Sequence, residues 1–267
     1  MSIPLSLSGK VALISGGSRG IGAATVRMFT AAGAKVAFSY RSARAQADAL
    51  AKECGADVCY PIASDLDNPE AARALVAETV RHFGRVDILV ANHGVWPEQD
   101  VAIDRMPDEQ WRSTLAINLD GVFGLVKYAV FQMKAQIKAQ TKSQPGGAPA
   151  GHIVLISSTS GQRGEAFHCD YAATKGAIIS LTKSLSSELA PEGIYVNCVA
   201  PGWVDTDMSA GALADPTTGE KIRSTIPLCR VGRPEEIAAP VLFLCTEHAG
   251  FISGEVFNVN GGAVLAG

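Results

Sequence analysis

Short apolar runs alternate with longer segments of helical character along almost the whole chain. The apolar runs have strand length and are continuously hydrophobic, which is typical of parallel strands covered on both faces. They occupy residues 11–15, 35–40, 57–63, 87–92, 152–157, 195–200 and 256–260. Helix-like segments lie near 20–33, 42–54, 68–83, 107–140, 170–190 and 234–247. This alternation predicts an α/β protein with a doubly wound parallel sheet.

The domain organisation follows from length and from the lack of a composition break. A chain of 267 residues is long enough for one sizeable core. The Pro/Gly-rich stretch 141–151 is expected to be a local loop rather than an interdomain linker. The turn-rich stretch 203–233 follows a strand end, where open α/β sheets bind ligands. We therefore expect one domain over 1–267 with a substrate loop at about 203–233, with an ordinary surface loop as the alternative.

Charge and composition exclude several classes of protein. The net charge of −3 gives no general basic field for nucleic acid or an anionic membrane. No apolar run approaches the roughly 18 residues of a membrane span, and the N-terminus lacks the features of a secretory signal. The six scattered cysteines contain no CxxC pair, so reduced thiols are expected rather than disulfides or a metal site. The chain is expected to be cytoplasmic.

A glycine-rich turn joins the first predicted strand to the first helix. It reads SGGSRGIG over residues 15–22, with Gly16, Gly20 and Gly22 in a Gly-x3-Gly-x-Gly spacing. In a doubly wound fold this turn faces a dinucleotide pyrophosphate, because glycines let the backbone approach the phosphates and the helix N-terminus supplies amide donors. The spacing also suits a purely structural turn, and its position at the first junction is what favours nucleotide binding.

The end of the second strand distinguishes the two nicotinamide cofactors. An acidic residue about 20 residues beyond the glycines would bind the ribose 2′-hydroxyl of NAD. The chain instead reads SYRS over 39–42, with Arg41 and no acid, and Arg19 of the glycine turn can approach the same position. Guanidinium groups pair well with phosphate. The pattern favours NADP(H), and two solvated surface arginines are the alternative.

A group of polar residues follows farther along the chain. Tyr171 and Lys175 in YAATK are four residues apart on a helical pattern, so they share one helix face. Ser158 comes at the end of the buried strand HIVLIS, where the cofactor is expected. Asn118 lies within an apolar helical segment although asparagine is a poor helix former. These side chains are expected to converge on one cleft.

These motifs, taken together, resemble those of the short-chain dehydrogenase/reductase family over residues 8–262. The matches, in chain order, are the glycine turn, SDL with Asp65, ANHG at 91–94, Asn118, Ser158, Tyr171-x3-Lys175 and APGWVDT at 200–206. The resemblance implies a single Rossmann domain with a seven-stranded parallel sheet. It is strongest to the 3-oxoacyl-[acyl-carrier-protein] reductases.

The resemblance also implies roles for individual residues. Asn118, Ser158, Tyr171 and Lys175 are expected to be catalytic. Asp65 is expected near the adenine ring, Asn92 near the adenosine ribose, and 201–206 near the nicotinamide. The full expected set of cofactor-binding residues is Gly16, Ser18, Arg19, Gly20, Ile21, Gly22, Tyr40, Arg41, Asp65, Leu66, Asn92, Gly94, Tyr171, Lys175, Pro201, Gly202, Val204 and Thr206.

The implied chemistry is hydride transfer between the nicotinamide and a carbonyl or alcohol carbon. Tyr171 exchanges the proton of the substrate oxygen, Ser158 hydrogen-bonds to that oxygen, and Asn118 anchors a water. A free tyrosine has a pKa near 10, and a nearby cation lowers that pKa. Lys175 is therefore expected to lower the pKa of Tyr171 and, as in the family, to hold the nicotinamide ribose.

The expected function is NADP(H)-dependent reduction of a ketone or 3-oxoacyl-type carbonyl to a secondary alcohol. The alternatives are a sugar or other polyol dehydrogenase and a non-catalytic NADP-binding sensor. An enoyl reductase of related fold would space its tyrosine and lysine more widely than Tyr171 and Lys175. The expected partners are a small-molecule substrate and further copies of the chain in a homotetramer, with no nucleic acid or membrane partner.

Two features bear on the substrate. His93 replaces the small residue usual in the NAG motif, and a packing or pocket-wall role is expected for it rather than catalysis. Glu192 stands where relatives serving an acyl carrier protein often have a basic residue, so weak dependence on a carrier protein is expected, although lysines 127, 134, 138 and 142 offer an alternative docking patch. The expected pocket wall consists of His93, Trp96, Gln162, Phe167, His168, Trp203 and the 207–230 loop.

Overall fold

The computed structural model describes residues 4–139 and 150–265. Within these ranges, seven strands form one parallel sheet in the order β3-β2-β1-β4-β5-β6-β7. The strands are β1 (Val11–Ile14), β2 (Lys35–Tyr40), β3 (Cys59–Ala63), β4 (Ile88–Ala91), β5 (Gly151–Ile156), β6 (Ile194–Pro201) and β7 (Val256–Val259). The strand order reverses between β1 and β4, so the crevice between them is where a ligand is expected in such a sheet.

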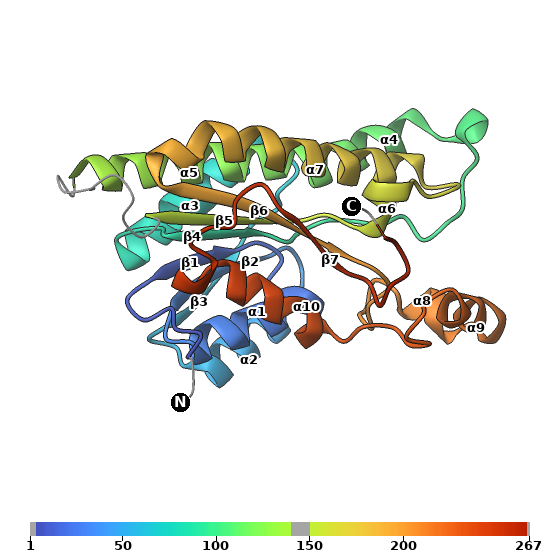
Figure 1. Ribbon diagram of the computed structural model, residues 1–267, viewed down its shortest axis with the longest axis horizontal. Helices are drawn as coiled ribbons and strands as arrows, with labels where there is room; N and C mark the ends of the chain where they lie inside the picture. Colours follow the sequence, from blue (N-terminus) through green and yellow to red (C-terminus); the bar gives the residue numbers. More distant parts are fainter. Residues whose placement is uncertain (1–3, 140–149, 266–267) are drawn as a thin grey trace.

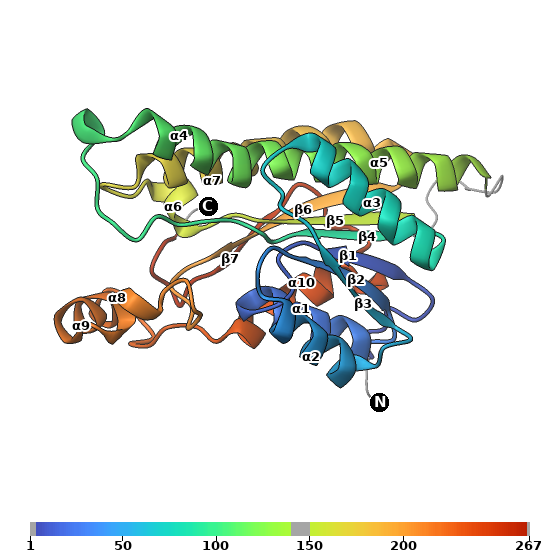
Figure 2. The ribbon, with the colours of Figure 1, turned by 180° about the vertical axis from the view of Figure 1, so that it is seen from behind.

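Two helical layers cover the sheet (Figures 1 and 2). One layer holds α1 (Gly20–Ala31), α2 (Arg44–Cys54) and α10 (Pro234–Leu244), and the other holds α3 (Pro69–Phe83), α4 (Asp108–Leu115), α5 (Gly121–Ala139) and α7 (Cys169–Leu189). Every residue of β1, β4 and β5 is buried. Burial on both faces explains why these strands are continuously apolar, and the predicted doubly wound, seven-stranded fold is confirmed.

The predicted helix over 107–140 is interrupted. The chain runs from α4 through a π-helical turn, Ala116–Asp120, into α5. By length and composition alone the stretch Asp108–Ala139 could cross a membrane. It packs instead along the sheet, with Val122, Leu125 and Met133 buried in the core. The predicted loop 141–151 lies almost wholly outside the described residues.

The substrate segment 203–233 contains two short helices, where the sequence indicated mainly turns. They are α8 (Ala210–Ala214) and α9 (Pro216–Ser224), and they project to one side of the body near the carboxyl ends of the strands (Figure 1). Asp215 caps α9 by accepting a hydrogen bond from the Thr218 amide at 2.7 Å. A further short helix, α6 (Thr159–Arg163), follows β5 and was not predicted.

Candidate active site

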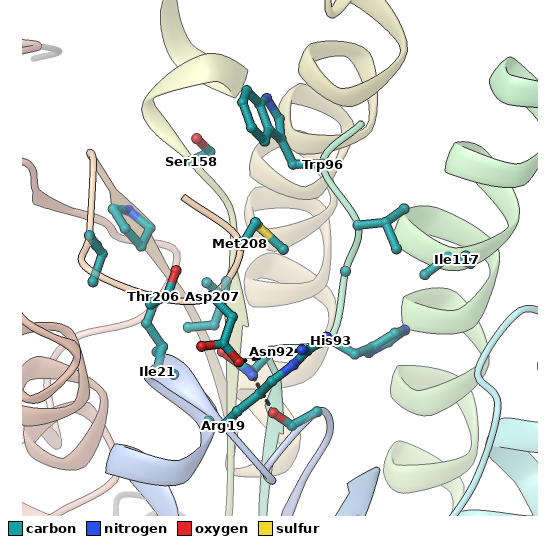
Figure 3. Close-up of a pocket in the computed structure, with 18 of the residues that line it drawn as sticks. Arg19, Ile21, Asn92, His93, Trp96, Ile117, Ser158, Thr206, Asp207 and Met208 are labelled. Carbon is teal, nitrogen blue, oxygen red and sulfur yellow. Dashed lines mark hydrogen bonds and ion pairs between the residues drawn. The ribbon is translucent and has the colours of Figure 1, made fainter. Parts of the chain in front are cut away.

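A pocket of ≈ 320 Å³ opens at the carboxyl ends of the central strands. This volume lies in the range of small-molecule sites. The turn after β1, the ends of β2, β4 and β5, helix α7 and the segment after β6 all contribute to its wall. Figure 3 shows Arg19 and Asn92 toward one end of the pocket and Ser158 and Trp96 toward the other. The pocket therefore has an end beside the glycine turn and an end beside Ser158.

The glycine turn has the backbone geometry of a phosphate cradle. Gly20 begins α1 with φ 52°, a left-handed conformation that favours glycine. A Cβ atom on Gly22 would collide with the carbonyl oxygen of Gly16, so only glycine lets the first turn of α1 lie this close to the end of β1. The first amide groups of a helix have no intrahelical acceptor and attract anions. The turn therefore fits a dinucleotide pyrophosphate.

Two arginines stand at this end of the pocket. Arg41 lies on the pocket wall next to Tyr40, is exposed, and has no ion-pair partner among the described residues. Arg19 forms an exposed ion pair with Asp207, with 3.4 Å between Nη1 and Oδ2. An exposed pair of this kind contributes little to stability, so either guanidinium can turn to a bound phosphate.

The end of β4 is fastened to the glycine turn. The Asn92 side-chain amide donates to the carbonyl oxygens of Ser15 and Gly16, each at 3.1 Å. The Ser15 hydroxyl accepts from the Asn92 and His93 amides, and it therefore donates its own proton to His93 Nδ1, at 2.8 Å. Burial, and secondarily the Lys175 charge, lowers the pKa of His93 to about 4. His93 is thus neutral and bound to the strand ends, which agrees with the expected pocket-wall role.

Three of the predicted catalytic side chains line the pocket together: Ser158, Tyr171 and Lys175. Ser158 caps α6, and its hydroxyl accepts from the Ser160 amide at 3.1 Å. The Lys175 ammonium donates to the Ile156 carbonyl oxygen at 2.9 Å and lies 5.6 Å from the centre of the Tyr171 ring. The Ser157 hydroxyl donates to the Lys175 carbonyl oxygen at 2.7 Å, which holds α7 against the end of β5.

The pKa of Tyr171 differs in direction from the sequence-based expectation. Burial raises this pKa to about 12, a hydrogen bond with Ser158 opposes the shift, and the Glu165 carboxylate adds to it. Burial also lowers the pKa of Lys175 to about 8. The expectation was wrong because burial of the phenol dominates the shift. At neutral pH Tyr171 holds its proton and is suited to act as an acid.

Asn118 lies apart from the pocket wall. It is fully buried in the π-helical turn. Its side chain accepts from the Val95 amide at 2.8 Å and donates to the Val95 carbonyl oxygen at 2.9 Å and to Thr174 at 3.3 Å. These contacts fix the segment after β4 against α7. The side chain's own hydrogen bonds make it a clamp in this structure, and its expected contact with a catalytic water stays a prediction.

The wall beyond Ser158 carries aromatic side chains and the Glu165 carboxylate, together with Arg163 of α6. Trp96 stacks on His168 with 4.9 Å between ring centres and meets Trp203 edge-on at 5.8 Å. The indole of Trp96 donates to a Glu165 carboxylate oxygen at 3.2 Å. The second Glu165 oxygen accepts from the Ser160 hydroxyl. Trp96, Ser160, Glu165 and Trp203 all line the pocket.

All eighteen predicted cofactor-binding residues line this one pocket, as does Ser158. Of the predicted substrate wall, His93, Trp96, Trp203 and residues 207–209 of the loop lie on it, whereas Gln162, Phe167 and His168 do not. His168 packs behind Trp96 and Phe167 is about half exposed, with φ 66°. The sequence analysis missed Ser160 and Glu165, because no spacing signal marks them and their position depends on the turn after β5.

Comparisons with known proteins agree with this geometry. A family model described as "Enoyl-(Acyl carrier protein) reductase" matches residues 16–264. The 3-oxoacyl-[acyl-carrier-protein] reductase of Synechocystis sp. is 37% identical over 263 residues, covering 97% of this chain and 99% of the relative.

Two solved structures are similar over nearly their full length. A 3-ketoacyl-(acyl-carrier-protein) reductase from Brucella melitensis, complexed with NADH, has a TM-score of 0.86 at 31% identity, covering 97% of this chain and 100% of that one. A short chain dehydrogenase from Burkholderia cenocepacia, in complex with NADP, has a TM-score of 0.83 at 33% identity, covering 96% and 98%. With these matches and the shared pocket, the chain belongs to the short-chain dehydrogenase/reductase family of oxidoreductases.

Proposed function

We propose that the protein reduces a ketone or 3-oxoacyl-type carbonyl to a secondary alcohol with NADP(H). The observation that carries this is the position of Ser158, Tyr171 and Lys175 on the wall of the same pocket as the glycine turn. A substrate oxygen beside the Ser158 and Tyr171 hydroxyls therefore lies in the same cleft as the glycine turn, which is suited to bind a dinucleotide. The relative from Synechocystis carries the name of a reductase of this kind.

The chain's residues supply the proton and hold the substrate oxygen. When bound, the cofactor supplies the hydride that reaches the carbonyl carbon. The Tyr171 hydroxyl gives its proton to the carbonyl oxygen. The Ser158 hydroxyl, which donates to Ser160 in the free protein, turns its proton to the substrate oxygen and stabilises the charge developing there. Lys175 places a positive charge beneath Tyr171, which favours the phenolate left after proton transfer. In alcohol oxidation the same groups act in reverse.

The cofactor is NADP(H), and the choice over NAD(H) rests on Arg41. The two solved relatives are described as complexes with NADH and with NADP, so family membership alone does not decide between the cofactors. In this chain the position after Tyr40 holds an exposed guanidinium on the pocket wall and no carboxylate. That group suits the 2′-phosphate of NADP(H).

Reduction of a carbonyl fits better than reduction of an enoyl double bond, despite the description of the matching family model. Tyr171 and Lys175 are adjacent on one face of α7, and both reach the pocket. The wider spacing expected of an enoyl reductase is absent from this pair. Dehydrogenation of a sugar or other polyol is the second candidate, because Glu165 and Ser160 add hydrogen-bonding groups to the substrate wall.

A dedicated acyl carrier protein partner is disfavoured. Lys134 of the proposed lysine patch is paired with Glu192, with 2.6 Å between Nζ and Oε1, so part of its charge is already neutralised. The C-terminal end of α5 lies at the opposite end of the molecule from α6 (Figure 1), which contributes Thr159, Ser160 and Arg163 to the pocket wall. Lysine 142 lies outside the described residues. Small ketones or short thioesters are therefore the expected substrates.

The test is an NADPH-oxidation assay on a panel of small ketones, short 3-oxoacyl thioesters and the matching carrier-protein thioester, at low and high salt. Turnover of ketones or short thioesters supports the proposal. No turnover of any member contradicts it, and polyol-dependent reduction of NADP+ alone would favour the second candidate. A hundreds-fold preference for the carrier-bound substrate that salt abolishes would make the carrier protein a partner after all.

We also propose where the protein is located, how it assembles and which segment covers the substrate. The protein is a cytoplasmic homotetramer with small-molecule substrates. Phe123 and Phe131 on α5 are exposed and support assembly, whereas Val122, Val126 and Met133 of the same helix are buried in the chain's own core. The segment 203–233 contributes Trp203, Val204 and 206–209 to the pocket wall and is the proposed substrate lid.

A further inference from the structure

Glu165 is a carboxylate in the substrate end of the pocket that the proposed mechanism does not use. Its side chain is only 18% exposed. It accepts from two neutral donors, the Trp96 indole at 3.2 Å and the Ser160 hydroxyl. Among the described residues, its one ion-pair contact is with His168, whose Nδ1 lies 3.7 Å from Glu165 Oε1, and no lysine or arginine pairs with it. A mostly buried carboxylate that faces a cleft and pairs with no permanently charged side chain is costly unless further donors reach it.

A chain of hydrogen bonds connects this carboxylate to the reacting centre. The Ser158 hydroxyl donates to the Ser160 hydroxyl at 3.2 Å, and Ser160 donates in turn to Glu165. Because Ser158, Ser160 and Glu165 all line the pocket, a group on the carbon next to a carbonyl bound at Ser158 can extend toward Glu165. Each carboxylate oxygen has two lone pairs and accepts one hydrogen bond within the described part of the chain, so acceptor capacity remains for a substrate donor.

The surroundings of Glu165 suit a hydroxyl donor on an otherwise apolar substrate. One face of the Trp96 ring is stacked on His168, and Trp203 meets Trp96 edge-on. These contacts leave fewer exposed faces on the Trp96 ring for a cation–π interaction with a substrate ammonium. The two indoles instead form an apolar wall beside an oriented acceptor, which is the combination that distinguishes a hydroxyl from a methyl group.

We propose that Glu165 is a specificity-determining residue that accepts a hydrogen bond from a hydroxyl group on the carbon next to the substrate carbonyl. The substrate class is then a neutral hydroxyketone, and the product is a vicinal diol. This inference rests on the proposed ketone reduction and narrows it. A carboxylate at the same position of the substrate is rejected because it would meet Glu165 as a like charge.

The experiment compares four ketones of nearly the same size in the full-length enzyme with NADPH. Hydroxyacetone carries the proposed hydroxyl, butanone carries a methyl in its place, aminoacetone an ammonium and pyruvate a carboxylate. A hydrogen bond to a charged acceptor predicts kcat/KM for hydroxyacetone roughly 10- to 150-fold above that for butanone, with pyruvate the poorest substrate.

Two variants separate recognition from a merely structural effect. Glu165→Gln keeps the shape but leaves only a neutral acceptor, so the preference for hydroxyacetone over butanone should fall about tenfold. Ser160→Ala breaks the link to Ser158 but keeps the carboxylate, so it should lower kcat for both ketones and keep their ratio. Glu98→Gln is the matched control, because Glu98 is exposed and does not line the pocket. NADPH affinity and circular dichroism report whether each variant is folded.

Each outcome decides the matter. Equal kcat/KM for hydroxyacetone and butanone in the unmodified enzyme refutes the role of Glu165 even if Glu165→Gln fails to fold. A preference for aminoacetone over hydroxyacetone, or loss of the preference in Ser160→Ala, also overturns it. Turnover of ketones without hydroxyl preference leaves the proposed function standing and removes only this inference, whereas no turnover of any ketone or thioester contradicts both.

Discussion

Replacement of Arg41 by alanine should weaken NADPH binding and leave NADH binding unchanged. Arg41 is exposed on the pocket wall and has no ion-pair partner among the described residues, so its guanidinium is available to the 2′-phosphate. A charge-assisted hydrogen bond contributes about 1.5–3 kcal/mol, which predicts a loss of roughly 10- to 150-fold in NADPH affinity. Arg19 limits the loss, because freeing it from its exposed pair with Asp207 costs only about 0–1 kcal/mol.

Fluorescence titration of both cofactors measures this directly. Arg44→Ala is the control, because Arg44 is close in sequence and exposed but pairs with Asp48 and does not line the pocket. Equal losses of NADPH and NADH affinity in Arg41→Ala would show that Arg41 does not bind the 2′-phosphate of NADPH. A native preference for NADH would refute the cofactor assignment as a whole.

Three further predictions concern pH, mobility and assembly. The pKa of Lys175 is lowered to about 8, so its charge is present below that pH. We therefore expect kcat/KM for ketone reduction to be constant near neutral pH and to fall above about pH 8. Lys175→Arg should move this fall to higher pH, and an unchanged pH profile would show that Lys175 does not cause it. Hydrogen exchange across 207–230 should be fast in the free protein and slow in a ternary complex, and slow exchange without ligand would make the segment a fixed structural element. Light scattering should give a mass near four times 27.8 kDa, and Phe131→Asp should lower it, whereas a monomer in the unmodified protein contradicts the assembly.

The sheet could be predicted because both of its faces are covered. All seven strands appear where continuous apolar runs predict them, and the helices of both layers follow the alternation between them. The π-helical turn at Asn118 could not be predicted, because it depends on hydrogen bonds to Val95 that form only in the folded chain. Helix α9 did leave a signal, since Asp215 and Pro216 are a capping residue and a first-turn proline.

The two ends of the site also differ in how far the sequence predicts them. The cofactor end is encoded in local motifs, the glycine turn and the end of β2, and their residues are found together in the pocket. The substrate end depends on contacts between segments far apart in the sequence, such as that between Trp96 and Glu165. The pKa of Tyr171 likewise depends on burial, which the spacing to Lys175 does not report.

The central claim is that Tyr171 is the proton donor in NADPH-dependent carbonyl reduction. The most direct test is the steady-state rate of NADPH oxidation with a ketone substrate by Tyr171→Phe, with Tyr195→Phe as a control outside the pocket. Loss of a general acid predicts a fall in kcat of roughly 10²–10⁴-fold, with NADPH affinity little changed. Turnover by Tyr171→Phe close to that of the unmodified enzyme would contradict the account.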